Sequence, residues 1–487
     1  MNLLKIVSII GLSTIISLFS GFIKGKIMAV YFGSSGLGIW SQATTLFMLG
    51  SIISLFGLNQ GLIKEIATKD KHNAVGDFIC GTLSKCLLFS ISNSLIISAV
   101  IIFCARGTSA FFFNHSLSPN IIIFIAVFLP FQVIGDILGV FLLANKELKR
   151  FTLANILISI FGLFSFIISV VFFNLRGAYL SIGICGIITF LSFYFISKPL
   201  IKVGFIGLFT FHRKLMDWDF LKNTLTFGAL RLIQVTINPV NTLLIRSLII
   251  KKIGFVENGF FDALNRLSMF YAPFITNILW SYTFPLYCEN KDKKQLGNEI
   301  NKFIRLSLVL FVPVCAVVML LGDVFVKLLF SKDFTPILSL FSLWFIFDLL
   351  RVTSWPMNIA LIAKDKMKLA VSLELFWNIV LLCLVYLLIA RYSLMGVMFS
   401  YIISFSLFLF INYLILNRSY VLQFNAKTFF VFCISVVLIF TAGKSGKALL
   451  DYIIIFSLGL IFFILIFDKQ ERLLMNDVIK KAIASNI

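Results

Sequence analysis

Apolar runs of about twenty residues recur from one end of this chain to the other, separated by short polar breaks. A helix of that length crosses the roughly 30 Å hydrocarbon core of a bilayer. Strands of a membrane barrel would instead alternate over about ten residues. The composition agrees, because 60% of the residues are hydrophobic and only 13% are charged. The sequence therefore predicts an all-α polytopic membrane protein.

The polar breaks divide the chain into about fourteen expected transmembrane helices. The first apolar run is too long for the core of a signal peptide and lacks a small-residue cleavage site, so we expect it to be retained as a span. The expected spans are 6–32, 38–63, 77–104, 119–144, 152–174, 177–197, 223–250, 257–287, 301–325, 335–363, 370–390, 393–416, 427–443 and 450–467.

Two parts of the chain show the same pattern where one span follows another. VYFGSSGLGIWSQATTLFMLG (30–50) can be laid beside KIGFVENGFFDALNRLSMFY (252–271), so that Gly33 matches Gly254 and Gly38 matches Gly259. The match joins the junction of spans 1 and 2 to the junction of spans 7 and 8. Two such repeats are typical of transporters whose substrate site lies between them, near the bilayer midplane.

This repeat predicts four regions. We expect an N-terminal six-helix lobe at 1–200, a cytoplasmic linker at 201–222, a C-terminal six-helix lobe at 223–416, and a C-terminal helix pair with a cytoplasmic tail at 417–487. The two lobes would surround a central cavity.

Lysine and arginine are unevenly distributed between the two sides of the membrane. The loops on the side of the N-terminus, together with both tails, hold well over half of the 42 basic residues. Because cytoplasmic loops are enriched in lysine and arginine, both termini are expected in the cytoplasm. The net charge of +21 then reflects topology and attraction to anionic lipid headgroups. Nucleic acid is not indicated as a partner, because the chain has no basic soluble domain.

Charged residues also occur inside the expected spans, and each costs on the order of 2.5–3.5 kcal/mol near the bilayer centre. Asp262 and Arg266 stand at i,i+4, and Asp348 and Arg351 at i,i+3, so each pair shares one helix face. For each pair, a salt bridge that only aids packing is an alternative to a functional role. The intramembrane charges are Lys24, Lys26, Lys85, Arg231, Arg246, Arg266, Arg351, Asp136, Asp262, Asp348 and Glu374.

Lys24 and Lys26 have no acidic residue within one helical turn. Two positions on a helix differ by about 200°, so the two lysines face different ways. Lys24 is roughly 13 Å from the end of its helix, and a lysine stem can snorkel over only part of that distance. We expect at least one of the two to point into a water-filled cavity and bind an anion, the alternative being snorkelling or a distant acidic partner. Because bases outnumber acids within the spans, such a cavity would attract a diphosphate and repel a lipophilic cation.

The sequence lacks the patterns of metal sites and of most enzymes. The 8 cysteines are scattered without a CxxC pair, and the 3 histidines lie in expected loops or near span ends. No HExxH sequence or nucleophile–base arrangement is present. We expect no catalytic residue, metal, cofactor or enzymatic activity.

Two stretches carry a family pattern. The first is GFIKGKIMAVYFGSSGLGIW followed by LFGLNQGLIKEIA; the second is RVTSWPMNIALIAKDKMKLAVSLELFWNIVLL followed by RYSLMGVMFSYIISFSLFLF, with Glu374, Asn378 and Gly396 at matching places. The chain resembles the Wzx-type O-antigen flippases, in the polysaccharide-transporter branch of the multidrug/oligosaccharidyl-lipid/polysaccharide exporter (MOP) superfamily. In span number and loop length the resemblance covers nearly the whole chain.

The resemblance implies a fold like that of MATE transporters and the lipid II flippase. It implies that the protein moves undecaprenyl-diphosphate-linked O-antigen units from the cytoplasmic to the periplasmic leaflet of the bacterial inner membrane, for lipopolysaccharide synthesis. In the related lipid II flippase, arginines thought to contact the diphosphate fall on Lys24 and Arg266. Lysine at position 24 keeps the charge but loses the planar fork of arginine. Lys26 and Arg231 are further candidates for diphosphate binding.

The resemblance also suggests coupling to a gradient of H⁺ or Na⁺. An intramembrane carboxylate that gains and loses a proton as the lobes rock could provide it. Asp136 and Glu374 have no local basic partner and are the first candidates, with a role in helix packing as the alternative for each. Asp262 and Asp348 have local arginines and rank lower, as acids lining the lumen. Expected partners are membrane lipids, an O-antigen polymerase and a chain-length regulator.

Two other functions are weighed against the flippase. A drug or metabolite antiporter of the same fold would line its cavity with acids and aromatics for cations, which the excess of intramembrane bases opposes. An O-antigen polymerase or ligase uses the same lipid carrier, but such enzymes usually carry a large periplasmic loop, and the outer loops here are short.

Overall fold

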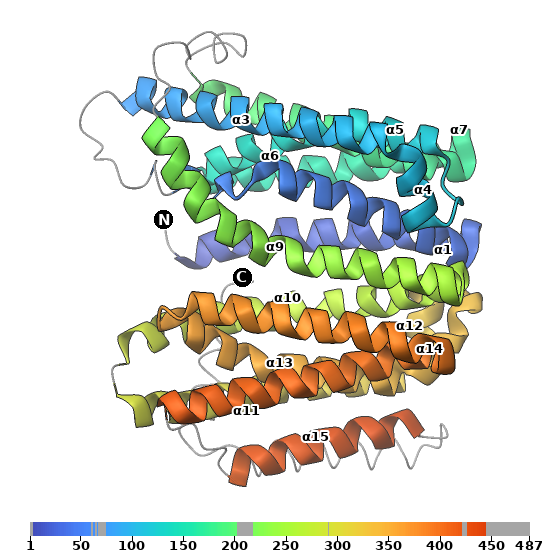
Figure 1. Ribbon diagram of the computed structural model, residues 1–487, viewed down its shortest axis with the longest axis vertical. Helices are drawn as coiled ribbons and strands as arrows, with labels where there is room; N and C mark the ends of the chain where they lie inside the picture. The colour runs from blue at the N-terminus through green and yellow to red at the C-terminus, as the bar shows by residue number, and fades with distance from the viewer. Residues whose placement is uncertain are drawn as a thin grey trace. The chain divides into compact units, whose positions relative to one another are not determined.

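The computed structural model of this protein describes residues 3–59, 62, 63, 66, 75–201, 218–290, 292–420 and 426–444. Among these residues every regular element is a helix (Figure 1). In chain order the elements are α1 (Leu3–Leu55), α3 (Val75–Phe103), α4 (Ala105–Phe113), α5 (Pro119–Val127), α6 (Leu129–Ala144), α7 (Leu148–Ser197), η1 (Lys198–Leu200), α9 (Trp218–Lys252), α10 (Phe255–Glu289), α11 (Lys293–Leu320), α12 (Gly322–Leu329), η3 (Lys332–Leu340), α13 (Phe341–Ala363), α14 (Met367–Tyr420) and α15 (Ala426–Lys444).

Eight segments of the described chain are long and apolar enough to cross a membrane. Three of them, in α1, α7 and α14, are 43, 53 and 53 residues long, which is about twice what one crossing requires. Each contains a residue with positive φ, at Gly33, Asn174 and Ser393, where two helices meet. The protein is an integral membrane protein that crosses the bilayer several times. The total of fourteen spans stays a prediction, because 450–467 lies outside the described residues.

The described residues form two compact units. Of the described residues, the first unit contains those up to Phe32 and Ile39–Ser247, and the second contains Gly33–Gly38 and those from Leu248 to Lys444. The division along the chain thus falls within α9. The expected linker at 201–222 and the tail of the C-terminal helix pair lie mostly outside the described residues, so the expected lobe boundaries stay predictions.

The first unit is built around α6. This helix packs against α7 and α3, while α5 packs against the same two helices (Figure 1). Val133, Ile137 and Phe141 recur every four residues and are at most 1% exposed, so they form one apolar stripe of α6. The stripe contacts buried side chains such as Leu83 of α3 and Phe193 of α7 in one apolar core. This core holds the helices that carry the polar groups of the first unit.

The second unit is built around α13, which packs against α10, α11 and α14, and α11 also packs against α15. Aromatic rings fill its interior. The ring of Trp344 lies 6.0 Å from that of Phe261 and 5.7 Å from that of Tyr401, measured between centroids. Both arrangements suit aromatic quadrupoles, which prefer tilted or edge-to-face contacts.

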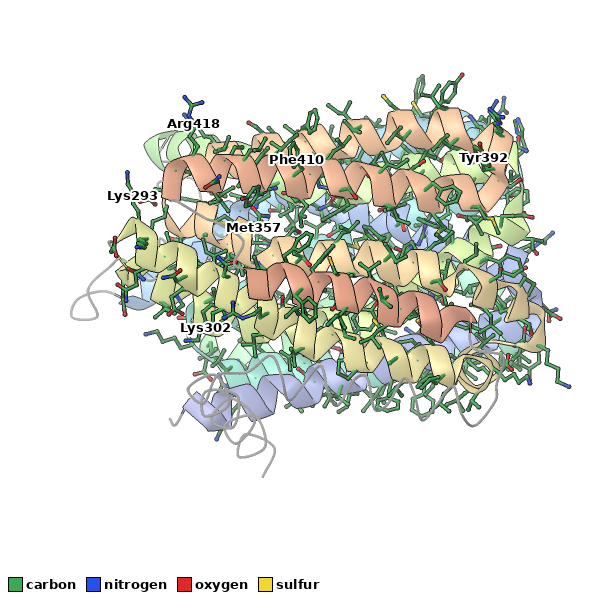
Figure 2. All side chains as sticks on the ribbon, turned by 90° about the horizontal axis from the view of Figure 1, so that it is seen from below. Lys293, Lys302, Met357, Tyr392, Phe410 and Arg418 are labelled. Atoms are coloured by element: carbon green, nitrogen blue, oxygen red, sulfur yellow. The ribbon has the colours of Figure 1, made fainter. Side chains whose placement is uncertain are left out.

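The surface of both units is apolar along the helices, as contact with lipid requires. Phe103 is 92% exposed, Phe172 is 74% exposed, and Phe410, within the second half of α14, is 57% exposed (Figure 2). In the second unit, Lys293 and Arg418 lie at one end of the helices and Tyr392 lies at the other (Figure 2). The charged ends and apolar middle match a unit that spans a bilayer.

A backbone pattern recurs in the two units. After α6 the amide groups of residues 145, 146 and 147 donate to the carbonyl oxygens of residues 141, 143 and 142, and after α13 residues 364, 365 and 366 donate to 360, 362 and 361 in the same order. The breaks in α7 and α14 also agree, with φ/ψ of 52/−136 at Asn174 and 51/−136 at Ser393. Gly33 and Gly254, matched by sequence, both have positive φ, at 65° and 124°. The internal repeat is therefore present in the backbone.

Candidate functional site

Hydroxyl groups fix the register between the first half of α1 and the first half of α7. The hydroxyl oxygens of Ser17 and Ser159 lie 2.7 Å apart, and the Ser20 hydroxyl donates to the carbonyl oxygen of Ser159 at 2.9 Å. Ser17, Ser20 and Lys24 are spaced by three and four residues, so they lie on one face of α1. The contacts therefore turn the face that carries Lys24 toward α7.

Lys24 lies one helical turn beyond Ser20. A Cβ built on Gly162 of α7 would lie 3.4 Å from Nζ of Lys24 and 3.5 Å from Sγ of Cys185. The ammonium group thus lies against α7, beside a position where α7 has no side chain. Among the described residues, no carboxylate forms an ion pair with Lys24 and no hydrogen bond of its Nζ is found. A cation is therefore held inside the membrane without an anion from the described chain.

The other candidate bases of the first unit differ from Lys24. Lys26 is half-buried and lies about 200° around α1 from Lys24, so it cannot reach the same part of α7. Arg231 belongs to α9, but its side chain lies outside the described residues. The roles of both in diphosphate binding stay predictions.

Asp136 of α6 is held by two neutral donors. The Ser51 hydroxyl donates to Oδ2 of Asp136 at 2.7 Å, and Nε2 of Gln132 donates to Oδ1 at 2.9 Å. Gln132 stands at i−4 on the same helix, whereas Ser51 comes from the second half of α1. Both oxygens of the carboxyl group therefore have a hydrogen-bond donor, and no ion pair of Asp136 occurs among the described residues.

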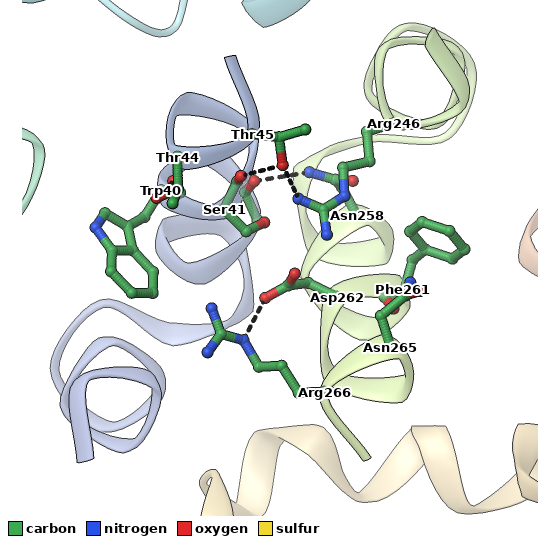
Figure 3. A network of polar contacts seen from close by, with 11 residues as sticks. Trp40, Ser41, Thr44, Thr45, Arg246, Asn258, Phe261, Asp262, Asn265 and Arg266 are labelled. Carbon is green, nitrogen blue, oxygen red and sulfur yellow. Dashed lines mark hydrogen bonds and ion pairs between the residues drawn. The ribbon is translucent and has the colours of Figure 1, made fainter. Parts of the chain in front are cut away.

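The pair Asp262–Arg266 of α10 forms as its spacing predicts. Nε of Arg266 lies 2.7 Å from Oδ2 of Asp262, in a charge-assisted hydrogen bond (Figure 3). The side chain of Asp262 is 5% exposed and that of Arg266 is 20% exposed. Because one edge of the guanidinium bonds to a buried carboxylate of its own helix, the direction of the Arg266 fork is fixed in the second unit.

Asp348 of α13 is the centre of a buried network, and its side chain is 0% exposed. Its Oδ1 lies 2.8 Å from Nη2 of Arg351, and its Oδ2 accepts hydrogen bonds from Ser268, at 2.6 Å, and from the Tyr271 hydroxyl. Nε1 of Trp344 donates to the Ser268 hydroxyl at 2.8 Å. These contacts join α10 to α13. The role of Asp348 as an acid lining the lumen stays a prediction.

Glu374 lies half-buried in the first half of α14, where its backbone carbonyl oxygen accepts a hydrogen bond from Nδ2 of Asn378 at 2.8 Å. Glu374 and Asn378, which both belong to the family pattern, are thus neighbours one turn apart on the same helix. The part of Glu374 in ion coupling stays a prediction.

Sequence reasoning missed the polar contacts that join distant helices. In the first unit Nε2 of Gln42 donates to Oγ of Ser247 at 3.0 Å. Nη1 of Arg246 donates to Oγ1 of Thr45 at 3.2 Å (Figure 3). The spacing of serines on α1 was the signal that could have revealed the contact with α7. Within the described ranges no group of three His, Cys, Asp or Glu residues is placed to hold a metal ion.

Comparison with known proteins identifies the family of this chain. The model of a family described as polysaccharide biosynthesis protein (Polysacc_synt_3) matches residues 27–339, which is more than half of the chain. The chain belongs to this family. Proteins called lipid III flippase, from Escherichia coli K12 and Shigella flexneri, are 23% identical over 399 residues, covering 81% of this chain and 94% of theirs.

Solved structures show the same fold. The lipid II flippase MurJ, in an inward closed conformation, has a TM-score of 0.69 at 16% identity, covering 96% of this chain and 99% of that protein. An inward-facing multidrug resistance MATE transporter of the MOP superfamily has a TM-score of 0.68 at 16% identity, covering 85% and 98%. The predicted MATE-like and lipid II flippase-like fold is confirmed. The protein has the fold of these transporters.

Proposed function

We propose that this protein is a flippase that moves an undecaprenyl-diphosphate-linked O-antigen unit across the bacterial inner membrane, from the cytoplasmic to the periplasmic leaflet, by alternating access. Membership of a polysaccharide biosynthesis family and the fold shared with a lipid II flippase support a lipid-linked saccharide as cargo. The relatives at 23% identity are named as flippases of lipid III, which is in keeping with a lipid cargo.

The observation that carries the proposal is the position of Lys24. Its ammonium group lies between α1 and α7, and no described carboxylate neutralises it. An unneutralised lysine in a membrane span costs on the order of 2.5–3.5 kcal/mol. A cargo that carries a diphosphate would supply the missing anion each time it crosses. Binding this anion would explain why the span keeps a lysine despite its cost.

Arg266 is the second proposed contact to the diphosphate. Arginine binds phosphate oxygens in a planar, bidentate way, and this requires a fixed orientation of its fork. The 2.7 Å bond to buried Asp262 supplies such an orientation. Asp262 is then a positioning group for Arg266. Lys26 and Arg231 remain secondary candidates that would add positive charge around the headgroup.

We further propose that transport is coupled to a cation gradient through Asp136 or Glu374. Asp136 is a half-buried carboxyl group whose two partners are a hydroxyl and an amide, which can stay bonded whether or not the acid carries a proton. Asp348 is already paired with Arg351 and is a weaker candidate.

The topology proposed for this function places both termini in the cytoplasm. The excess of basic residues on the N-terminal side supports it. In this orientation the diphosphate would enter from the cytoplasmic leaflet, and the saccharide would be delivered outside to an O-antigen polymerase and its chain-length regulator.

The test distinguishes a flippase from a MATE-like antiporter. The purified protein is reconstituted into liposomes, and transbilayer movement of undecaprenyl-diphosphate oligosaccharide is followed beside uptake of a cationic dye. We expect lipid movement and no dye uptake. Dye uptake by folded protein, without lipid movement, would identify an antiporter instead.

A further inference from the structure

We infer that α7 forms the second wall of the Lys24 anion site, with Gly162 as a positioning residue for the ammonium group and the Cys185 thiol facing the bound anion. This inference rests on the proposed function, because it concerns the same diphosphate contact. It assigns residues of α7, which neither the sequence pattern nor the family resemblance singled out.

The register between the two helices brings these groups together. Ser17 and Ser20 bond to Ser159, and one turn farther along each helix stand Lys24 on α1 and Gly162 on α7. Because helix positions three or four apart lie on the same face, the hydrogen bonds at one turn place the lysine and the glycine opposite each other at the next.

Lys24, Gly162 and Cys185 also lie at a similar depth in the membrane. The break at Asn174 separates the first half of α7, which carries Gly162, from the second half, which carries Cys185. Both residues lie roughly 17 Å along their helix from this break, at 1.5 Å per residue. Lys24 lies roughly 13 Å from the break at Gly33. All three are therefore near the middle of a hydrocarbon core of about 30 Å.

The distances define what each residue of α7 does. A Cβ at position 162 would lie 3.4 Å from Nζ of Lys24 and 3.5 Å from Sγ of Cys185, which is ordinary van der Waals contact. One methyl group therefore fits there, but a branched side chain would occupy the place of the ammonium group. The thiol is a weak, uncharged neighbour, so it leaves the lysine charge available to an anion.

The first test places a carboxylate at the thiol. In Cys185→Asp, the new carboxylate lies beside Lys24 and competes with the diphosphate, whereas Cys185→Asn has the same size and no charge. We expect the apparent KM for undecaprenyl-diphosphate oligosaccharide in liposomes to be at least about tenfold higher for Cys185→Asp than for Cys185→Asn, since a like-sized neutral group cannot compete for the cation. Equal KM values for two folded variants would overturn the inference.

The second test examines the glycine. We expect Gly162→Val to lose several-fold more transport than Gly162→Ala, and the exposed Gly107→Val, where nothing lies within 4 Å of a Cβ, to retain it.

A third test measures protection of the cysteine. In a variant that keeps Cys185 as its only cysteine, inorganic pyrophosphate should slow alkylation of the thiol, and Lys24→Ala should remove this protection. This readout needs no Gly162 variant to fold.

The outcomes separate the inference from the proposed function. If Lys24→Ala abolishes lipid movement while pyrophosphate never protects Cys185, then α7 does not line the anion site, but the proposed flippase function is still supported. If Lys24→Ala transports normally, the diphosphate contact itself is wrong, and the inference fails with it.

Discussion

Gly38 of α1 and Gly259 of α10 cross at backbone contact in the second unit. A Cβ on Gly38 would lie 2.8 Å from the amide nitrogen of Gly259, and a Cβ on Gly259 would lie 2.0 Å from the carbonyl oxygen of Ser34. Nδ2 of Asn258 donates to the carbonyl oxygen of Gly38 at 2.8 Å. The two glycines that the repeat aligns therefore touch each other, and each contacts the segment that precedes its counterpart.

This crossing predicts a strong effect of one methyl group. Gly259→Ala requires the backbones to separate, and we expect it to lower the free energy of unfolding by about 1–3 kcal/mol, as overpacking does. Gly107→Ala in α4 is the control, because it adds a methyl group in open space and should be neutral or slightly stabilising. Thermal unfolding in detergent measures both. Equal unfolding midpoints for Gly259→Ala and Gly107→Ala would show that the backbones at Gly38 and Gly259 are not in close contact.

The Asp348 network predicts a graded loss of stability. Asp348→Ala leaves the half-buried Arg351 without its carboxylate and the buried Ser268 and Tyr271 without their acceptor, which together should cost about 3 kcal/mol. Tyr271→Phe removes one donor to the same carboxylate and should cost about 1 kcal/mol. The comparison uses unfolding midpoints and protein yield. If Asp348→Ala is as stable as the native protein but does not transport, Asp348 is a functional acid and not a packing group.

Asp136 should control the response to a proton gradient. The wild-type protein is expected to move lipid faster when a pH gradient is imposed across the liposome, and Asp136→Asn should move it at a rate that no longer depends on the gradient. Glu374→Gln is measured in parallel, and the variant that loses the response marks the coupling residue. If the wild-type rate of lipid movement does not depend on the pH gradient, transport is not coupled to protons.

Two exposed cysteines report the orientation of the chain. Cys104 lies where α3 meets α4, and Cys288 lies near the end of α10. With both termini in the cytoplasm, Cys104 faces the periplasm and Cys288 the cytoplasm. In variants that keep only one cysteine, a membrane-impermeant maleimide added to intact spheroplasts should label Cys104 and leave Cys288 unlabelled until the cells are opened. The reverse pattern would invert the topology.

Contacts within one helix were predictable from the sequence, and contacts between helices were not. Asp262–Arg266 and Asp348–Arg351 follow from i,i+4 and i,i+3 spacing, and both ion pairs form. Helical periodicity says nothing about which distant helix a face meets. Ser268 and Tyr271 therefore appear beside Asp348, and Gly162 beside Lys24, only once the helices are packed.

The fold itself was readable for a physical reason. Only helices and closed barrels satisfy their backbone hydrogen bonds in hydrocarbon, and apolar runs of about twenty residues have the length of helices and not of barrel strands. The breaks inside α7 and α14 were also expected, between spans 5 and 6 and between spans 11 and 12. Their detailed geometry was not, because Asn174 and Ser393 adopt positive φ without being glycine.

The central claim is that Lys24 binds the diphosphate of the lipid carrier. The most direct test is the initial rate of undecaprenyl-diphosphate oligosaccharide movement in liposomes that contain equal amounts of folded wild type, Lys24→Ala, Lys24→Arg or the exposed control Lys149→Ala. We expect Lys24→Ala to fall roughly tenfold or more, because a hydrogen bond to a charged group contributes about 1.5–3 kcal/mol. Lys24→Arg and Lys149→Ala should keep most of the rate. A Lys24→Ala protein that moves the lipid as fast as the wild type would contradict the account.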